Sequence, residues 1–114
     1  MSGVLLDTER VVLVVDPGVC RLTSKIEAWS EDGVVKCKIE SRCLHVQEFA
    51  EKLEGMSMMD IVKMPFSENK VFQVGGTTLK HSTCVVPTAV LKAMEAAAGL
   101  GLKKDVCLKF QKQP

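Results

Sequence analysis

The first third of the chain has the hydrophobic spacing of β-strands. Residues 11–15 are a continuous apolar run that ends at Asp16-Pro17-Gly18, which predicts a buried strand followed by a turn. Apolar and polar residues alternate over residues 22–29 and again over residues 34–41. The segment 30–33 between them has a common hairpin length. We therefore expect a three-stranded antiparallel meander.

In the middle of the chain the hydrophobic period changes from two to about 3.6 residues. The apolar stripe of a helix is formed by Val46, Phe49, Ala50 and Leu53. Gly55 ends this helix. Ser57 and Asp60 have capping-box spacing, with Asp in the place of Glu, and predict a second helix that runs to Lys63 and stops before Pro65.

The last third of the chain begins with the strongest helical signal. Pro87 suits a first helical turn, and the Ala-rich run at residues 88–98 consists of good helix formers, with Gly99 or Gly101 as the stop. Ahead of it, residues 71–74 are compatible with a short strand. Near the C-terminus, residues 105–110 alternate and place their apolar side chains on one face, which predicts a fourth strand.

Together these elements predict an α+β fold. We expect a two-layer sandwich in which an antiparallel meander of three strands, with a C-terminal strand, is backed by two to three helices. A chain of 114 residues is long enough for one hydrophobic core, so we expect a single domain over residues 1–114, with loose ends at residues 1–9 and 111–114. No internal repeat or low-complexity linker divides it.

Charge and hydropathy exclude two classes of partner. The 15 basic and 14 acidic residues give a formal charge of +1, so nucleic acid and anionic membranes exert no strong attraction. No apolar run approaches the roughly 20 residues of a membrane span, and the N-terminus lacks the features of a secretion signal. We expect a cytoplasmic protein whose five cysteines, an odd number, are reduced thiols and not a disulfide framework.

The up-and-down course of the predicted strands brings three cysteines to one end of the sheet. Cys20 follows the first strand, Cys43 follows the third, and Cys84 precedes the long helix. A helix that returns to the sheet edge before a final upward strand must begin at this same end. We therefore expect the sulfur atoms of these cysteines within one site, with His81 beside them.

The cysteines at this end suit metal binding. Cysteine next to a helix N-terminus favours the thiolate, because the free amides and the helix dipole are positive there. Three thiolates and an imidazole match a closed tetrahedral zinc site, and thiolates also bind iron. His81 is the first candidate for the fourth ligand, with Asp16, in the first place a turn former, and His45 as alternatives. Cys37 and Cys107 lie inside predicted strands, and we interpret them as buried packing residues.

The order of these features carries a resemblance to a known family. It runs from Val-Asp-Pro-Gly-Val-Cys20 through a strand hairpin, Cys43 at a helix start and a short Gly-Met-Ser-Met-Met-Asp helix to His81 and Cys84 ahead of an Ala-rich helix. This order resembles the NifU-type (IscU-like) iron-sulfur cluster assembly scaffolds over residues 11–98. The resemblance implies a three-stranded sheet backed by helices, and a cluster site at these three cysteines and the histidine.

The chain departs from the family pattern at three points. Arg21-Leu22 stands where the family has an Asp tied to cluster release, and Ser82-Thr83 separate a histidine and a cysteine that are adjacent in the family. The predicted strand at Val106 has no counterpart there. The chain also resembles small uncharacterised proteins of methanogens and anaerobic bacteria, which implies no activity.

The function that we expect is binding of zinc or an iron-sulfur cluster by a scaffold or carrier, with sulfur donor or cluster acceptor proteins as partners. A homo-oligomer is compatible with this function. One alternative is a thiol-dependent enzyme or redox protein that uses Cys84 as the nucleophile and His81 as its base. Another is a protein-interaction module without a metal site, which uses the methionine-rich residues 56–64 as an adaptable surface.

Overall fold

The sheet is a three-stranded antiparallel meander, as the alternation predicts. The computed structural model describes residues 10–113. Strands β1 (Arg10–Val15), β2 (Ser24–Glu31) and β3 (Val34–Ser41) lie in the order β1-β2-β3. Their register aligns Val15 with Ser24 and Ser24 with Ser41, so these three residues form the last row at one end of the sheet.

The connection between β2 and β3 is a two-residue hairpin. Pairing continues to Glu31 and Val34, so only Asp32 and Gly33 remain in the loop. Both have positive φ angles, 54° and 79°. An Asp-Gly pair with positive φ at both positions is the sequence preference of a tight turn whose twist matches that of the flanking strands.

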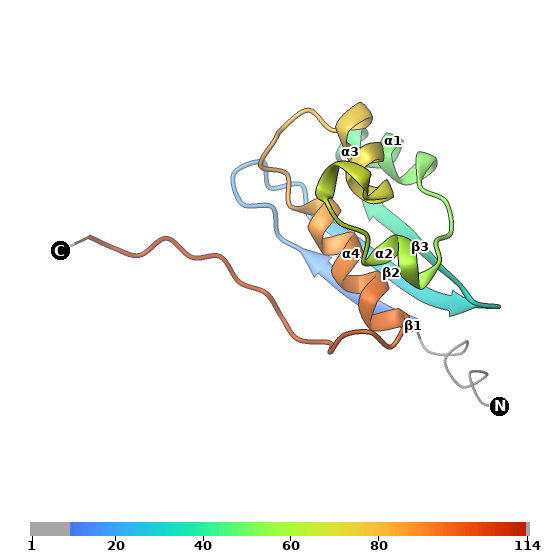
Figure 1. Ribbon diagram of the computed structural model, residues 1–114. Coiled ribbons are helices and arrows are strands. Elements are labelled where there is room, and N and C mark those ends of the chain that lie inside the picture. Colours follow the sequence, from blue (N-terminus) through green and yellow to red (C-terminus); the bar gives the residue numbers. More distant parts are fainter. Residues whose placement is uncertain (1–9, 114) are drawn as a thin grey trace.

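The helices cover one face of the sheet (Figure 1). In chain order they are α1 (Leu44–Lys52), α2 (Met58–Ile61), the 3-10 helix η2 (Phe66–Glu68), α3 (Lys70–Thr78) and α4 (Val86–Ala97). Helix α4 packs across β1 and β2, whereas α1 packs on β3 and α3 joins the two helices. The largest fully buried apolar side chains between these layers are Phe49, Ile26, Met94, Val35, Val71 and Val90. The structure is therefore the α+β two-layer arrangement that the sequence predicts.

No helix of residues 10–113 covers the other face of the sheet. Val12 and Val14 of β1 are 53% and 64% exposed on this face. Next to them Arg10 lies over the ring of Trp29, 4.2 Å from the ring centroid, and its guanidinium bonds Glu27 at 3.4 Å. This face is thus charged over β2 and apolar along β1.

Residues 71–74 are helical, and the prediction of a short strand there was wrong. They belong to α3, whose N-cap is Asn69, with its side-chain oxygen accepting a hydrogen bond from the Val71 amide at 3.0 Å. Gly75 of α3 is buried next to α4, where a Cβ would make an ordinary contact of 3.4 Å with the Pro87 ring. Packing on the neighbouring helix, which no local pattern reveals, overrides the strand preference of the valines.

The helix that begins after Ser57 is shorter than predicted. Its capping box is present, with the Ser57 hydroxyl and the Asp60 carboxylate each bonding the other's backbone amide at 3.2 Å. The helix ends at Ile61 and does not reach Lys63, whose amide bonds the Asp60 carbonyl at 3.4 Å in a tighter turn. The Asn69 side chain donates to the carbonyls of Ile61 and Lys63, which have no partner within the helix.

The predicted fourth strand is absent from the part of the chain that the structure describes. Helix α4 ends at Gly99, where a φ of 78° and the bonds from Gly99 to Ala96 and from Leu100 to Glu95 close the last turn. Residues 102–113 then run as an extended, exposed segment away from the domain (Figure 1). A strand requires a ladder partner, and none of the described strands pairs with this segment. Over residues 10–113, no helix has the length and hydropathy needed to cross a membrane.

Candidate cysteine site

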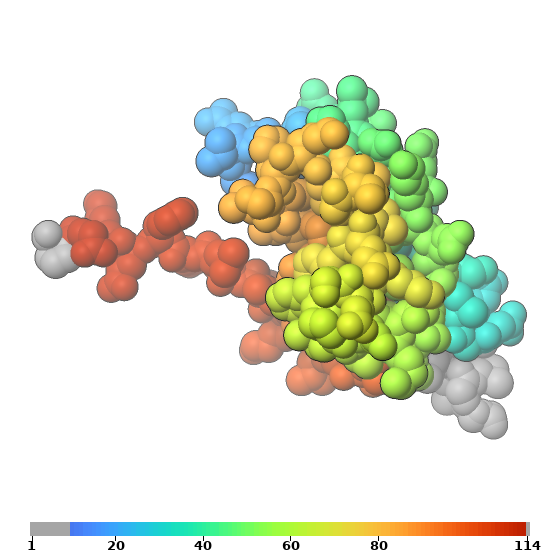
Figure 2. Space-filling model, turned by 45° about the horizontal axis from the view of Figure 1, so that its top comes forward, coloured from blue at the N-terminus to red at the C-terminus, as the bar shows by residue number. Residues whose placement is uncertain are grey.

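Three cysteine-bearing segments lie at the same end of the fold. The register places the loop after Val15, which contains Cys20, at the end of the sheet where β3 finishes at Ser41, two residues before Cys43. The segment that contains Cys84, ahead of α4, lies beside the loop of residues 16–23 in both views (Figures 1 and 2). The three segments therefore share one end of the fold, as expected, although the C-terminal strand from which the place of Cys84 was argued is absent from residues 10–113.

Cys20 lies in a tight turn of the β1–β2 loop. The turn is closed by a 3.1 Å bond from the Arg21 amide to the Gly18 carbonyl, with positive φ at both ends. Asp16 fixes its entry, because its carboxylate accepts a hydrogen bond from the Gly18 amide at 3.0 Å. The turn-forming role predicted for Asp16 is thus confirmed. Val19 and Cys20, at the tip, are exposed, and Val19 is 99% so.

Cys43 is the N-cap residue of α1, and it is half-buried. Its backbone amide donates to the Ser41 hydroxyl at 3.1 Å, which turns the chain from β3 into the helix. The Cys43 side chain accepts no capping hydrogen bond, and the first turn of α1 contains no acidic residue. The thiol therefore sits beside helix amides that no side chain of the cap satisfies.

Cys84 and His81 are the two ends of one turn. The Cys84 amide donates to the His81 carbonyl at 3.1 Å, and this bond defines a turn that brings the two α-carbons to within about 7 Å. His81 is exposed, whereas Cys84 is half-buried. Val85, the N-cap of α4, has no side chain that can bond the free amides, and no acidic residue lies in the first turn.

The helices that begin at this end differ from the two other α-helices in their N-terminal caps. Ser57 caps α2 and Asn69 caps α3 through their side-chain oxygens. The helices α1 and α4 begin without such a cap, at Cys43 and Val85. Free amides and the positive end of the helix dipole favour a negative group, so both helix starts favour a thiolate or another anion.

Ser24 adds an unpaired polar group to this end of the sheet. Its side chain is 1% exposed on the helix-covered face, and its hydroxyl has no hydrogen-bond partner among residues 10–113. Buried hydroxyls are almost always paired, so such an atom requires an explanation. Sequence reasoning missed Ser24; the available signal was a serine at an inward-facing position, next to the predicted turn that carries Cys20.

The ligand assignment itself remains a prediction. Within residues 10–113, no three His, Cys, Asp or Glu side chains are grouped as metal ligands. Cys20, Cys43, Cys84, His81 and Asp16 all lie on the segments at the cysteine end of the fold, while His45 is half-buried in the first turn of α1.

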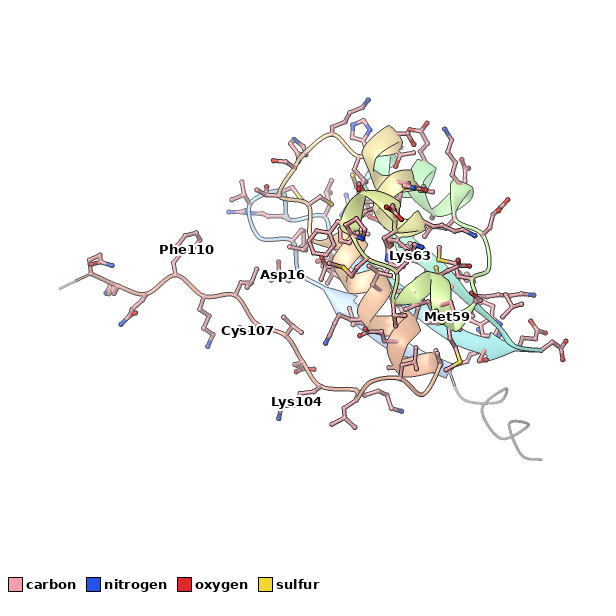
Figure 3. All side chains as sticks on the ribbon, in the orientation of Figure 1. Asp16, Met59, Lys63, Lys104, Cys107 and Phe110 are labelled. Atoms are coloured by element: carbon pink, nitrogen blue, oxygen red, sulfur yellow. The ribbon has the colours of Figure 1, made fainter. Side chains whose placement is uncertain are left out.

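The two other cysteines, Cys37 and Cys107, differ in burial. Cys37 is half-buried among the core side chains of the sheet, as predicted, and burial raises the pKa of its thiol to about 11. The prediction that Cys107 is buried was wrong, because it lies exposed on the extended C-terminal segment (Figure 3). The alternation that suggested burial operates only where a neighbouring strand and a core are present.

The methionine-rich segment is largely a surface. Met56 is buried and pairs with Val35 through two backbone hydrogen bonds. In contrast, Met58, Met59 and Met64 are 46%, 75% and 62% exposed. Met59 and Lys63 project from the α2 region in Figure 3. This arrangement is compatible with the interaction surface considered from the sequence.

The fold and the three cysteine turns define a small α+β domain with a thiol-rich end. The chain belongs to a family of unknown function, DUF6951, whose match covers residues 11–110. This match includes the exposed C-terminal segment as well as the sheet and helices. No curated protein and no solved structure gives a significant match.

Proposed function

We propose that the protein binds zinc or an iron-sulfur cluster through Cys20, Cys43 and Cys84, as a scaffold, carrier or sulfur acceptor. The observation that carries the proposal is the placement of these cysteines on three turns at one end of the domain. His81 and Asp16 are the candidates for a fourth ligand. Sulfur donor and cluster acceptor proteins are the corresponding partners.

The electrostatics of the two helix starts support a thiolate site. Cys43 and Cys84 stand next to helix amides that no side-chain cap satisfies, and the helix dipole favours negative charge there. A metal ligand must be deprotonated, so a site that stabilises thiolates also strengthens metal binding. The chemistry of the donor set, soft sulfur with one imidazole, fits zinc and iron better than it fits magnesium or calcium.

The exposure of the three thiols supports a site that can exchange its ligand. Cys43 and Cys84 are half-buried against the core, so the domain holds their positions. Cys20 is exposed at the tip of a turn, where its side chain is accessible to solvent and to another protein. A bound cluster would supply iron and sulfide for delivery. An acceptor protein would reach it from the side of the site on which Cys20 is exposed.

The proposal is tested by the metal content of protein purified without oxygen. We expect zinc or iron in stoichiometric amount, and for a cluster also visible absorption from sulfur-to-iron charge transfer. Cys20→Ser, Cys43→Ser and Cys84→Ser should each lower the metal content strongly, because serine oxygen is a poor ligand for soft metals. Cys107→Ser is the matched control, since this thiol is exposed but lies on the C-terminal segment.

Two results would overturn the proposal. Metal content that is the same in all three serine variants as in the parent would exclude these cysteines as ligands. Metal-free protein in which Cys84 alkylates rapidly at neutral pH, with loss of this reactivity in His81→Ala, would favour the thiol-dependent enzyme.

A further inference from the structure

The outer edge of β1 is a bare apolar strand edge. Among the described residues β1 pairs only with β2, so every second residue of β1 directs its amide and carbonyl outward without a ladder partner. Residues 11–15 contain no charge, proline or bulge, which are the usual features that prevent an edge strand from pairing with another chain. Val12 and Val14 add exposed apolar side chains along it.

The opposite edge of the sheet differs. Strand β3 carries Lys36, Lys38 and Glu40 on its exposed side. Met56 bonds the backbone of Val35 from outside, at 2.7 and 2.9 Å, and α1 packs against the strand. The β3 edge is therefore protected by charged side chains, by Met56 and by α1, whereas the β1 edge is open.

The chain also contains an unpaired segment of strand character. Residues 105–110 alternate in polarity and are as many as the six residues of β1. Val106, Leu108 and Phe110 are 64%, 83% and 107% exposed on the extended segment. Figure 3 shows Lys104, Cys107 and Phe110 along this segment, well away from the sheet. Such side chains lose contact with water only if another surface covers them.

We infer that residues 105–110 of one copy pair with β1 of a second copy, reciprocally, so that each sheet gains a fourth strand. The segment lies off its own domain, so its own β1 edge and the segment are both available to a partner. A two-fold exchange covers both β1 edges and both segments within one closed dimer. The family match includes both elements of this pairing, since it covers residues 11–110.

Charge favours a parallel alignment. With Val106, Leu108 and Phe110 on the helix side of the sheet, parallel pairing puts Asp105 beside Arg10, the one charged residue of β1. Antiparallel pairing of the same faces puts Asp105 beside Asp16, and like charges side by side are unfavourable. In the parallel alignment Cys107 lies next to Val12.

Sedimentation of the full chain, with a chelator and a reductant so that neither metal nor disulfide links copies, tests the exchange. We expect twice the 12.5 kDa monomer mass. Leu108→Pro should reduce this to the monomer mass, because proline removes a ladder donor. Lys112→Pro is the matched control and should remain dimeric. Both variants should melt cooperatively as folded domains, since neither residue packs on the core.

A cross-link distinguishes exchange between copies from docking within one chain. A chain with Val12→Cys and Cys107→Ser is mixed with the parent chain and oxidised with diamide. We expect a disulfide-linked heterodimer, and no comparable product when the second chain carries Cys107→Ser. Monomeric protein at all concentrations would overturn the inference. So would a cross-link that forms only within single chains when a chain with Val12→Cys retains Cys107.

Discussion

The Cys84 amide donates to the His81 carbonyl at 3.1 Å, so a histidine and a cysteine three residues apart are the two ends of one turn at the start of α4. Ser82 and Thr83, which separate them in the sequence, are the exposed central residues of this turn. The separation in sequence therefore does not separate them in space. The pair can act on one ligand or on each other.

His81→Ala and Cys84→Ser distinguish a metal site from a reactive thiol. In a metal site both substitutions should lower the metal content, Cys84→Ser more strongly, because the thiolate carries a charge and the imidazole does not. In a thiol enzyme His81→Ala should instead slow the alkylation of Cys84 at neutral pH, without a metal effect. Metal analysis and iodoacetamide rates on the same preparations measure both. His45→Ala tests the alternative imidazole ligand in the first turn of α1, and Cys107→Ser is the control outside the site.

Stability should fall at high pH because of Cys37. Burial raises the pKa of this thiol from 9.0 to about 11, so between these values the unfolded chain releases the proton and the folded chain keeps it. The free energy of unfolding should therefore decrease as the pH rises from about 9 to 11, by about 1 to 3 kcal/mol from this group. Urea unfolding at several pH values measures it.

Cys37→Val is the informative comparison, because it retains an apolar side chain and removes the titrating group. Its stability should depend less on pH than that of the parent in the same range. Cys107→Ser should keep the full dependence, since this thiol is exposed. An equal slope in the parent and Cys37→Val would show that other groups cause the loss.

Asn69→Ala should be among the most destabilising single substitutions outside the apolar core. This side chain is 3% exposed, donates to the carbonyls of Ile61 and Lys63 at 3.3 and 3.2 Å, and accepts from the Val71 amide. Its removal leaves buried groups unpaired and α3 without a cap, so we expect a loss of about 2 to 4 kcal/mol in denaturant unfolding.

Asn69→Asp separates the two roles of this side chain. Aspartate keeps an acceptor for the Val71 amide but cannot donate to the two carbonyls. If Asn69→Asp proved as stable as the parent, capping alone would account for the contribution of Asn69 to stability. We expect it to be destabilised, because a carboxylate would face two carbonyl oxygens.

Ser24→Ala should increase stability. The Ser24 hydroxyl is buried without a partner, and its removal relieves an unpaired polar group, for an expected gain of about 1 kcal/mol. Ser41→Ala is the matched comparison in the same row of the sheet. It should lose about 1 kcal/mol, because the Ser41 hydroxyl accepts from the Cys43 amide. Thermal unfolding of both variants measures whether each substitution raises or lowers the stability. A loss in Ser24→Ala would mean that this hydroxyl is bonded in solution.

Features with a local cause could be predicted from the sequence. The Ser57–Asp60 capping box and Pro87 in the first turn of α4 each depend on backbone angles or hydrogen bonds within a few residues. The hairpin was expected over residues 30–33, and pairing leaves only Asp32 and Gly33 in its loop. The strand alternation also gave the meander, and with it the common end of the segments that carry Cys20 and Cys43. Side-chain period and short-range hydrogen bonding act before any remote contact forms, so they are visible in the sequence.

Features that depend on remote partners were decided only by the tertiary structure. The valines of residues 71–74 are helical because α3 packs between α1 and α4, and the carbonyls at the end of α2 find their partner in the side chain of Asn69. Residues 105–110 have a strand pattern but no strand, because alternation supplies the faces of a strand and only a neighbouring backbone supplies its hydrogen bonds. In the same way the sequence determined which cysteines share one end of the sheet, whereas their burial was decided by what packs around each thiol.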